Sequence, residues 1–232
     1  MMGLFDRKKR PTIDQTALIT EARYVVVDTE LTGLDEKKDS IVSIGAVRMA
    51  GGTIDLGDSF YRLVSPKTEL KADTVCIHEI MPSDVAEQPR IDAVLNEFLD
   101  YAGHEILVGH FLSIDLSFLN REMKRIHGCE LSNPVLDTFS VYEWLRKRSK
   151  ARDCFVTPAG GYGLLDLVKC FGIPVHGAHN AVMDAFATAQ LLQRFIPLLG
   201  EAGVQDIGEL LKVGTPFEGG DRFRLSGEFG NF

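Results

Sequence analysis

Short runs of β-branched and apolar residues mark the strands that the sequence predicts. Residues 24–28 (Tyr-Val-Val-Val-Asp) have the composition of a central strand that is covered on both faces. Two longer runs, 41–49 and 53–64, are separated by a Gly-Gly turn and therefore predict a hairpin. Two short apolar runs, 105–109 and 134–137, predict two further strands.

Apolar residues at helical spacing separate the later strands. They predict helices at the end of 82–102 and over 113–127, 138–148, 163–171 and 180–199. A brief helix is also expected near 14–20. Three strands come first, and helices then alternate with short strands of the parallel type. This order predicts an α/β fold with a mixed central sheet that is flanked by helices on both faces.

The same pattern divides the chain into three parts. Residues 1–20 are expected to form a polar N-terminal arm, residues 21–200 the folded domain, and residues 201–232 a C-terminal tail outside the core. The tail is rich in glycine and polar residues but contains four phenylalanines, Phe217, Phe223, Phe229 and Phe232. It can dock a polymerase or a second subunit, pack back on its own domain, or stay mobile.

Composition limits the cellular setting. The 232 residues are 45% hydrophobic and 25% charged, which suits one well-packed globular domain. No apolar stretch is long enough to cross a bilayer, and the basic N-terminus lacks the apolar segment of a secretory signal. The four cysteines are scattered and form no Cys-x-x-Cys pair. We therefore expect a cytoplasmic protein with reduced thiols and no membrane partner.

The formal net charge of −8 argues at first against a nucleic-acid partner, because phosphate neutralisation usually needs a basic excess. Either a carboxylate cluster that binds divalent cations or a local basic patch can reverse that argument. The sequence contains a candidate patch at 146–152 (Arg-Lys-Arg-Ser-Lys-Ala-Arg). These cations can guide a nucleic-acid strand, or they can simply complement the C-terminus of the preceding helix.

Two carboxylates stand where the first strand ends, in Asp28-Thr29-Glu30. Side chains two apart on a strand point to the same face, so both carboxylates converge on one spot. Two like charges in one place cost energy unless a cation joins them. The alternative is that Asp28 and Glu30 only solvate the end of a strand.

Two further acids lie at helix starts. Asp115 follows the strand of residues 105–109 and can be either a functional carboxylate or an acid favoured by the helix dipole, with Ser113 as the cap. Asp184 lies five residues after His179, near the start of the long 180–199 helix. In isolation this pair is as easily a surface acid and a capping histidine.

Taken together, these residues resemble the DEDD exonucleases. The resemblance covers residues 22–198 and rests on Asp-x-Glu at a strand exit, a lone Asp about eighty-five residues later, and His-x-x-x-x-Asp near the end. The histidine is typical of the DEDDh branch, which includes the bacterial polymerase proofreading (epsilon) subunit, RNase T and oligoribonuclease. Three shorter motifs extend the resemblance: Thr32-Gly33-Leu34, Ile77-His78 and Leu136-Asp137-Thr138.

The resemblance implies an RNase H-like fold and a two-metal mechanism. It makes Asp28, Glu30, Asp115 and Asp184 the ligands of two divalent ions, Mg²⁺ or Mn²⁺, which prefer hard oxygen ligands. His179 is then the general base that takes a proton from the attacking water. The expected products are nucleoside 5′-monophosphates.

The same resemblance implies a pocket for the terminal nucleotide. Thr32, Gly33 and Leu34 are expected to line it, His78 and Ile80 to close its other side, and His110 to lie near the phosphate path. His78 and His110 can instead be ordinary hydrogen-bonded loop histidines.

Two residues depart from the family pattern. Leu31 stands where the family usually has a threonine, and Phe111 stands where it usually has an asparagine. Phe111 can stack on a base or pack in the interior. Neither change removes a metal ligand, so both bear on substrate preference.

These expectations favour a metal-dependent exonuclease that hydrolyses single-stranded nucleic acid from its 3′ end, with DNA favoured over RNA. An exoribonuclease or oligoribonuclease is the alternative within the same chemistry, since no motif reports contacts to the 2′-hydroxyl. A catalytically silent polymerase accessory that binds nucleic acid is a third reading. A polymerase subunit is a possible partner, and the oligomeric state is open.

Overall fold

The computed structural model describes residues 13–148, 161–174 and 179–217 of the chain. It contains a five-stranded sheet in the order β3-β2-β1-β4-β5. The strands are β1 (Arg23–Leu31), β2 (Ile41–Ala50), β3 (Thr53–Leu63), β4 (Ile106–Gly109) and β5 (Val135–Asp137). The pairs β1–β2 and β2–β3 are antiparallel, whereas β1–β4 and β4–β5 are parallel. The predicted mixed sheet and the predicted hairpin are both confirmed.

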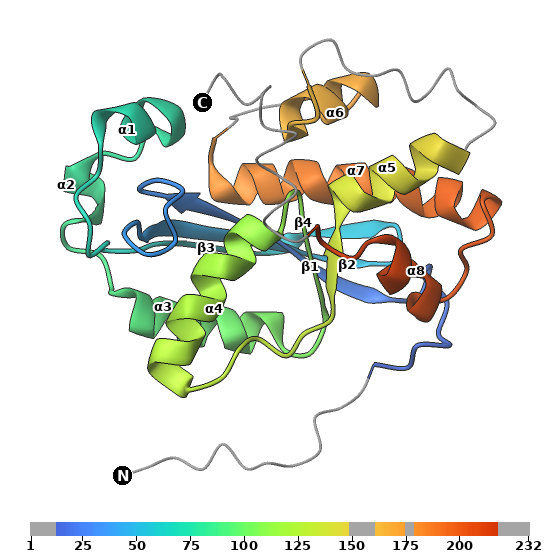
Figure 1. Cartoon of the computed structure of the whole chain (residues 1–232), viewed down its shortest axis with the longest axis horizontal. Helices are drawn as coiled ribbons and strands as arrows, with labels where there is room; N and C mark the ends of the chain where they lie inside the picture. Colours follow the sequence, from blue (N-terminus) through green and yellow to red (C-terminus); the bar gives the residue numbers. More distant parts are fainter. Residues whose placement is uncertain (1–12, 149–160, 175–178, 218–232) are drawn as a thin grey trace.

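Helices cover both faces of this sheet (Figure 1). They are α1 (Ala72–His78), α2 (Pro82–Val85), α3 (Ile91–Ala102), α4 (Ser113–His127), α5 (Thr138–Arg148), α6 (Leu164–Cys170), α7 (Ala181–Glu201) and α8 (Ile207–Val213). Helices α3 and α4 lie below the sheet in this view, and α5, α6 and α7 lie above it. None of the described helices combines the length and the apolar composition that a membrane span needs.

Alternation along β1 divides the core into two layers. Tyr24 and Val26 pack with α5, α7 and α8, whereas Val25 and Val27 pack with α3 and α4. Successive side chains of a strand point to opposite faces, so one buried strand supplies both layers. This double covering is what the β-branched composition of the strand predicted.

The expected helix near residues 14–20 is wrong. These residues form turns, and Leu18 makes an isolated antiparallel bridge with Asp206. The carboxylate of Asp14 accepts hydrogen bonds from the backbone nitrogen (2.9 Å) and the hydroxyl (2.7 Å) of Thr16. Such local bonds compete with helix formation. Residues 1–12 of the expected arm lie outside the described residues.

The expectation that the chain after residue 203 stays out of the core is also wrong for its first part. Val204, Ile207 and Leu210 are buried in the layer that contains α7. The residues form α8, which Asp206 caps by accepting a hydrogen bond from the Glu209 backbone nitrogen at 2.8 Å. Phe217 packs against the same layer. The rest of the tail, 218–232, lies outside the described residues.

Candidate active site

Three carboxylates meet beside the C-terminal end of β1, beyond the part of that strand that pairs with β4. Strand β4 pairs with β1 only at Tyr24–Val26, so β1 continues past it and carries Asp28 and Glu30 beyond the last parallel pair. Asp184 reaches the same spot from the first turn of α7. One oxygen atom from each of these three carboxylates lies within 4.8 Å of the others. The two acids expected to converge from β1 therefore do so, and a third joins them.

Asp115 approaches this group from α4. It is 6% exposed, and its Oδ1 accepts hydrogen bonds from the backbone nitrogen (3.0 Å) and the hydroxyl (2.6 Å) of Thr29. Thr29 lies between Asp28 and Glu30, so these bonds fix α4 to the strand that carries both acids. Asp115 stands outside the closely spaced group of three but lines the same cavity.

His179 and Asp184 are connected through the backbone at the start of α7. Asn180 caps the helix by accepting a hydrogen bond from the Val182 backbone nitrogen at 3.2 Å. His179 adopts a left-handed conformation (φ 64°), and its backbone nitrogen donates to Asp184 Oδ2 at 3.0 Å. The His179 side chain is exposed and lines the cavity. The predicted pair is thus brought to the predicted site.

Burial and mutual repulsion make these acids hard to ionise. Burial, followed by the charges of Asp115, Glu30 and Asp184, raises the pKa of Asp28 well above its ordinary value. The same two causes raise the pKa of Glu30 to about 8. Burial raises the pKa of Asp115 to about 7, although the Thr29 bonds oppose it, and burial also raises the pKa of Asp184.

A cavity of about 610 Å³ opens beside the acids. One wall is the loop after β1, which contributes Leu31, Gly33 and Leu34. The α1 helix contributes a second wall that includes His78. This helix was not predicted, although its Ile77-His78 pair was singled out. A third wall comes from residues 161–166 and 169 and from the Phe111 loop.

Thr32 and Ile80, which were expected to line this pocket, lie behind its walls. The Thr32 side chain is fully buried, and its hydroxyl accepts a hydrogen bond from the Ser40 backbone nitrogen at 2.9 Å. Ile80 is buried in a small cluster with Val42 and Val85. Both residues therefore shape the walls from inside the protein.

His78 and His110 both line the cavity but differ in their bonding. His78 is 5% exposed, and its Nδ1 accepts a bond from the Ile80 backbone nitrogen at 3.0 Å. Its Nε2 has no partner among the described residues. His110 has both ring nitrogens engaged, with Thr138 Oγ1 and with the Tyr162 carbonyl, each at 2.9 Å. Burial lowers the pKa of His110 to about 4, so it is a neutral histidine that ties residue 162 to the core.

Phe111 is held beside His110 by its neighbours. Its backbone is left-handed (φ 54°), and its ring lies 4.6 Å from the His110 ring and 4.7 Å from the Phe139 ring. The ring is partly buried against the core and also lines the cavity. Of the two expected roles, packing is the one that the described contacts support.

Comparison with known families identifies the family to which the chain belongs. Residues 25–192 match the model of the RNase_T exonuclease family, a span that includes every acid of the site and His179. The chain belongs to this exonuclease family. Its members are exonucleases, so the chain is a hydrolase of this class.

Relatives of this exonuclease include DNA polymerase III proteins of bacteria. The DNA polymerase III subunit epsilon of Aquifex aeolicus is 32% identical over 187 residues, which cover 79% of this chain and 83% of that protein. The PolC-type DNA polymerase III of Thermotoga maritima is 31% identical over 193 residues, or 83% of this chain. The match spans only 13% of that much longer polymerase.

Solved structures show the same fold. Exonuclease X in complex with 5′-overhanging duplex DNA superposes with a TM-score of 0.61 at 24% identity, covering 82% of this chain and 98% of that one. Escherichia coli exonuclease I in complex with a dT13 oligonucleotide gives a TM-score of 0.64 at 16% identity, covering 78% and 42%. The exonuclease therefore has the expected RNase H-like fold.

The acids of this exonuclease fit divalent cations. Exonucleases of the family depend on divalent metal ions, and Asp28, Glu30 and Asp184 present closely spaced carboxylate oxygens. Burial and mutual repulsion, which raise the pKa values of Asp28 and Glu30, disfavour their ionised forms, and bound cations would favour those forms. Oxygen ligands of this kind suit Mg²⁺ and Mn²⁺.

Heat stability of the metal-free protein should fall between pH 5 and pH 8. An acid whose pKa is higher in the folded than in the unfolded state binds more protons when folded, so stability is lost as pH rises through that interval. The pKa of Glu30 rises from 4.5 to about 8 and that of Asp115 from 3.8 to about 7, so the loss of stability falls in this pH range.

Mg²⁺ or Mn²⁺ should reverse this loss. At about 100 times its dissociation constant, a bound ion stabilises by about 2.7 kcal/mol, or roughly 5–10 °C in melting temperature. Melting curves with EDTA and with each metal at pH 5 and pH 8 measure both effects. A metal-induced rise as large at pH 5 as at pH 8 contradicts the prediction.

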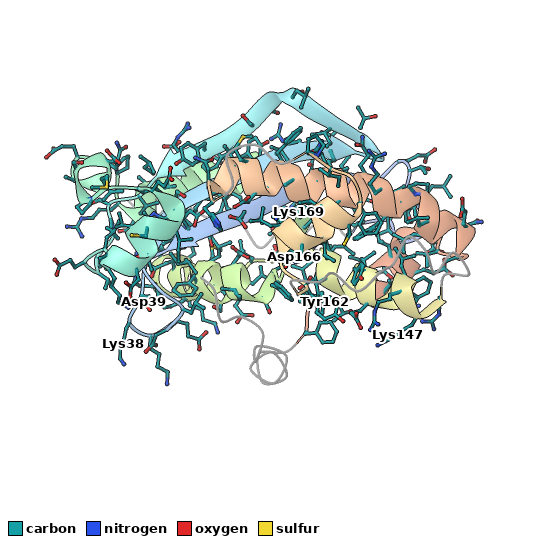
Figure 2. The ribbon with its side chains drawn as sticks, turned by 90° about the horizontal axis from the view of Figure 1, so that it is seen from above. Lys38, Asp39, Lys147, Tyr162, Asp166 and Lys169 are labelled. Atoms are coloured by element: carbon teal, nitrogen blue, oxygen red, sulfur yellow. The ribbon has the colours of Figure 1, made fainter. Side chains whose placement is uncertain are left out.

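Sequence reasoning missed one cation at the site. Lys169, in the last turn of α6, is the only lysine or arginine on the described cavity wall. Figure 2 shows it with Tyr162 and Asp166 near the middle of the molecule, away from Lys147. A basic residue in the last turn of a helix has no distinguishing sequence signal. Only the tertiary structure brings it to the acids.

The described part of the predicted basic run is engaged locally. Arg146 donates two hydrogen bonds to Glu143, at 2.8 and 2.9 Å, and Lys147 lies 3.8 Å from the same carboxylate. The Arg148 guanidinium stacks over the Trp144 ring at 4.4 Å. These contacts engage the three cations on their own helix, and neither expected role of the basic run is tested by them. Residues 149–152 lie outside the described residues.

Replacing Lys169 with alanine should weaken substrate binding. One lost phosphate contact reduces the slope of log affinity against log salt by about 0.7 for a single strand. Affinity for an oligonucleotide, measured by fluorescence anisotropy in EDTA at several salt concentrations, tests this slope. Lys212→Ala on α8, which removes an exposed lysine from outside the cavity, is the matched control. Identical slopes for both variants and the wild type contradict the prediction.

Proposed function

We propose that the chain is a 3′→5′ exonuclease that hydrolyses single-stranded nucleic acid, preferentially DNA, to nucleoside 5′-monophosphates. The observation that carries the proposal is the meeting of Asp28, Glu30 and Asp184 within 4.8 Å beside the 610 Å³ cavity. That volume lies within the range of about 300–1,000 Å³ for small-ligand pockets, so it suits the end of one strand. The epsilon and PolC relatives support DNA as the substrate.

Two divalent ions, Mg²⁺ or Mn²⁺, would be held by Asp28, Glu30, Asp115 and Asp184. When bound, such ions lower the pKa of a coordinated water and stabilise developing charge on the leaving oxygen. Thr29 holds Asp115 through two hydrogen bonds, which leaves the second oxygen of that carboxylate for this purpose.

His179 would accept the proton of the attacking water. Two observations support this role: its side chain is exposed and lines the cavity, and its backbone nitrogen donates a hydrogen bond to Asp184, one of the proposed metal ligands. Imidazole is the side chain best suited to take up a proton near neutral pH. His179 has a left-handed backbone conformation and lies before the first residue of α7, so the direction of its side chain is not set by the helix.

The experiment that tests the proposal is a time course on single-stranded DNA and RNA labelled at either end. Reactions run with Mg²⁺, with Mn²⁺ and with EDTA, and Asp28→Ala is the inactive control. A metal-dependent ladder that shortens from the 3′ end supports the proposal, and the faster of the two substrates identifies the preferred sugar. An RNA preference favours the exoribonuclease alternative. Absence of cleavage with either metal favours the silent nucleic-acid binder.

Exchanging His179 for glutamine should lower kcat by about 10²–10⁴-fold, the usual contribution of general acid–base catalysis. Glutamine keeps a polar side chain but cannot accept the proton. The KM and the metal-induced rise in melting temperature should stay near wild type, because the backbone bond to Asp184 remains. Steady-state kinetics and melting curves measure these quantities. A variant with wild-type kcat shows that His179 is not the base.

The epsilon relative also supports a polymerase as partner. We propose that the chain associates with the DNA polymerase of its own cell, as the names of its relatives, a DNA polymerase III subunit and a PolC-type polymerase, suggest for those proteins. Co-elution of the purified chain with that polymerase in size-exclusion chromatography tests the association. Elution of the chain as the same species with and without the polymerase counts against it.

A further inference from the structure

The loop between β1 and β2 is closed by one buried carboxylate. Asp39 is 3% exposed, and its Oδ1 accepts a hydrogen bond from the Thr32 hydroxyl at 3.2 Å. Its Oδ2 accepts one from the Asp35 backbone nitrogen at 2.9 Å. A Cβ atom on Gly33 would lie 2.4 Å from Asp39 Oδ2, so the carboxylate packs directly against the backbone of the cavity wall. The position of Gly33 and Leu34 in the cavity therefore depends on Asp39.

The same carboxylate reaches the second wall. The Lys71 ammonium lies 3.0 Å from Asp39 Oδ1. Lys71 directly precedes α1, whose residues Thr74, Ile77 and His78 line the cavity on the other side. The ion pair thus joins the two segments, the β1–β2 loop and α1, that each contribute a wall of the cavity.

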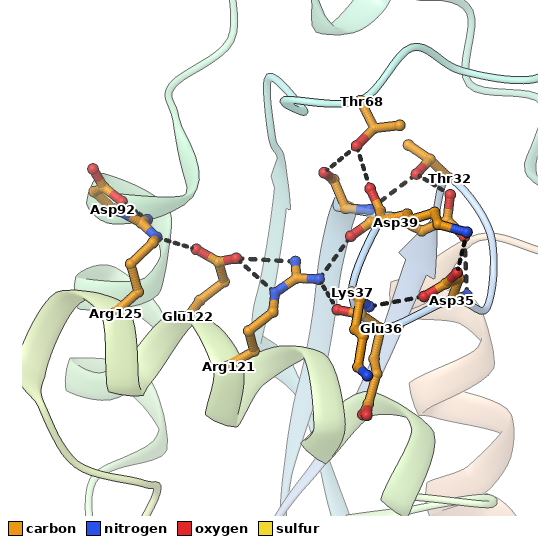
Figure 3. Close-up of polar contacts among 12 residues, drawn as sticks. Thr32, Asp35, Glu36, Lys37, Asp39, Thr68, Asp92, Arg121, Glu122 and Arg125 are labelled. Carbon is orange, nitrogen blue, oxygen red and sulfur yellow. Dashed lines mark hydrogen bonds and ion pairs between the residues drawn. The ribbon is translucent and has the colours of Figure 1, made fainter.

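A third connection leads to the helix that carries Asp115. Arg121 of α4 donates to the backbone oxygen of Asp39 at 2.8 Å and to that of Glu36. Figure 3 shows this contact as part of a row that continues from Arg121 through Glu122 to Arg125 and Asp92. The loop is therefore fixed to α4 on one side and to α1 on the other.

We propose that Asp39 is a positioning residue that sets the affinity of the exonuclease for the terminal nucleotide by holding the β1–β2 loop against α1 and α4. It lines no part of the cavity itself. Burial would raise the pKa of Asp39, but Lys71 and the Asp35 backbone nitrogen more than offset it and keep the carboxylate ionised. This inference rests on the proposed exonuclease function.

The direction in which loss of the Asp39 charge changes substrate affinity distinguishes a positioning role from simple charge repulsion. Removing a negative charge near a site for a polyanion should strengthen binding, because repulsion of the phosphates is reduced. Loss of a positioning contact should weaken binding, because the two walls no longer keep the separation that the nucleotide needs. Asparagine keeps the size of the side chain, removes the charge and presents an N–H group in place of one acceptor oxygen.

The variant Asp39→Asn should raise the KM for a single-stranded oligonucleotide by about 10-fold or more, a factor that the loss of a charged hydrogen bond can supply. Its kcat should stay within about threefold of wild type, and the metal-induced rise in melting temperature should be unchanged, because the acids are untouched. Lys71→Met should reproduce part of the KM increase. Lys71→Arg, which can still pair with Asp39, should keep the KM near wild type. Glu36→Gln, in the same loop, is the control for charge alone, because the Glu36 side chain is exposed and its described hydrogen bond uses the backbone oxygen.

An unchanged or lower KM in Asp39→Asn overturns the proposal. A fall in kcat and in the metal-induced rise in melting temperature, alongside the rise in KM, also overturns it. Such a result indicates general damage to the fold. If the wild type cleaves no strand, the proposed function fails independently. Binding of thymidine 5′-monophosphate with Mn²⁺, measured by calorimetry, then decides the matter: weakening by Asp39→Asn supports the positioning role, and equal affinity overturns it.

Discussion

Replacing Asp28 with asparagine is expected to lower kcat by about 10³-fold or more and, at the same time, to make the metal-free protein more resistant to heat at pH 8. Asp28 is one of the three closely spaced acids, so its charge is needed to hold cations. Without cations, that charge is unfavourable, since burial and three neighbouring carboxylates oppose its ionisation. Activity and stability should therefore change in opposite directions.

The measurement combines oligonucleotide cleavage in Mg²⁺ with melting curves in EDTA at pH 5 and pH 8. The stabilisation by asparagine should be larger at pH 8, because the cost of the raised Asp28 pKa grows as pH rises from the unfolded pKa of 3.8 towards the higher folded pKa. Asp100→Asn is the matched control, because Asp100 is exposed on α3 and makes none of the described contacts. An inactive variant that also melts earlier than wild type in EDTA would show that Asp28 mainly supports the fold.

Much of this site could be predicted because local patterns encode it. Asp28 and Glu30 share a face through the two-residue period of a strand, and the long apolar pattern of residues 180–199 places Asp184 in the first turn of α7. The acids therefore lie on elements whose type is fixed by periodicity. Their meeting is a consequence of sheet order, which the sequence alone does not specify.

Elements with weak periodicity were missed. The seven residues of α1 and the seven of α8 are too short to show an amphipathic repeat. For α8 the glycine-rich surroundings suggested a tail, yet a capping signal is present in Asp206 and Glu209. Glu209 Oε2 also accepts a hydrogen bond from the backbone nitrogen of Gln205, the residue before the N-cap, at 3.0 Å.

Side-chain roles in the cavity walls depend on contacts between distant residues. Thr32 was expected in the pocket, but its hydroxyl serves the buried network of Asp39 instead. His110 is engaged by Tyr162, which lies 52 residues away. Lys169 reaches the cavity because α6 packs beside α7. No local pattern reports such long-range partners, so these assignments needed the structure.

Substituting Gly45 with alanine is expected to lower kcat by about 10²-fold, as a displacement of about 1 Å at a catalytic group can do. Gly45 lies on β2 opposite Asp28, and a Cβ atom there would lie 2.1 Å from the Val182 backbone nitrogen and 2.2 Å from the Ala181 carbonyl carbon. Because these are backbone atoms, the start of α7 must move away from the sheet. Asp184 moves with it and leaves the group of acids.

Kinetics and metal-induced shifts in melting temperature measure this displacement. Overpacking typically costs about 1–3 kcal/mol, so the variant should fold and remain measurable. The metal-induced shift should shrink along with kcat, since one ligand is misplaced. Gly52→Ala makes the same substitution at the β2–β3 turn, where an added Cβ atom meets nothing within 4 Å, and it should behave as wild type. If Gly45→Ala retains full activity, the approach of α7 to β2 does not set the position of Asp184, and the cluster must tolerate movement of that helix.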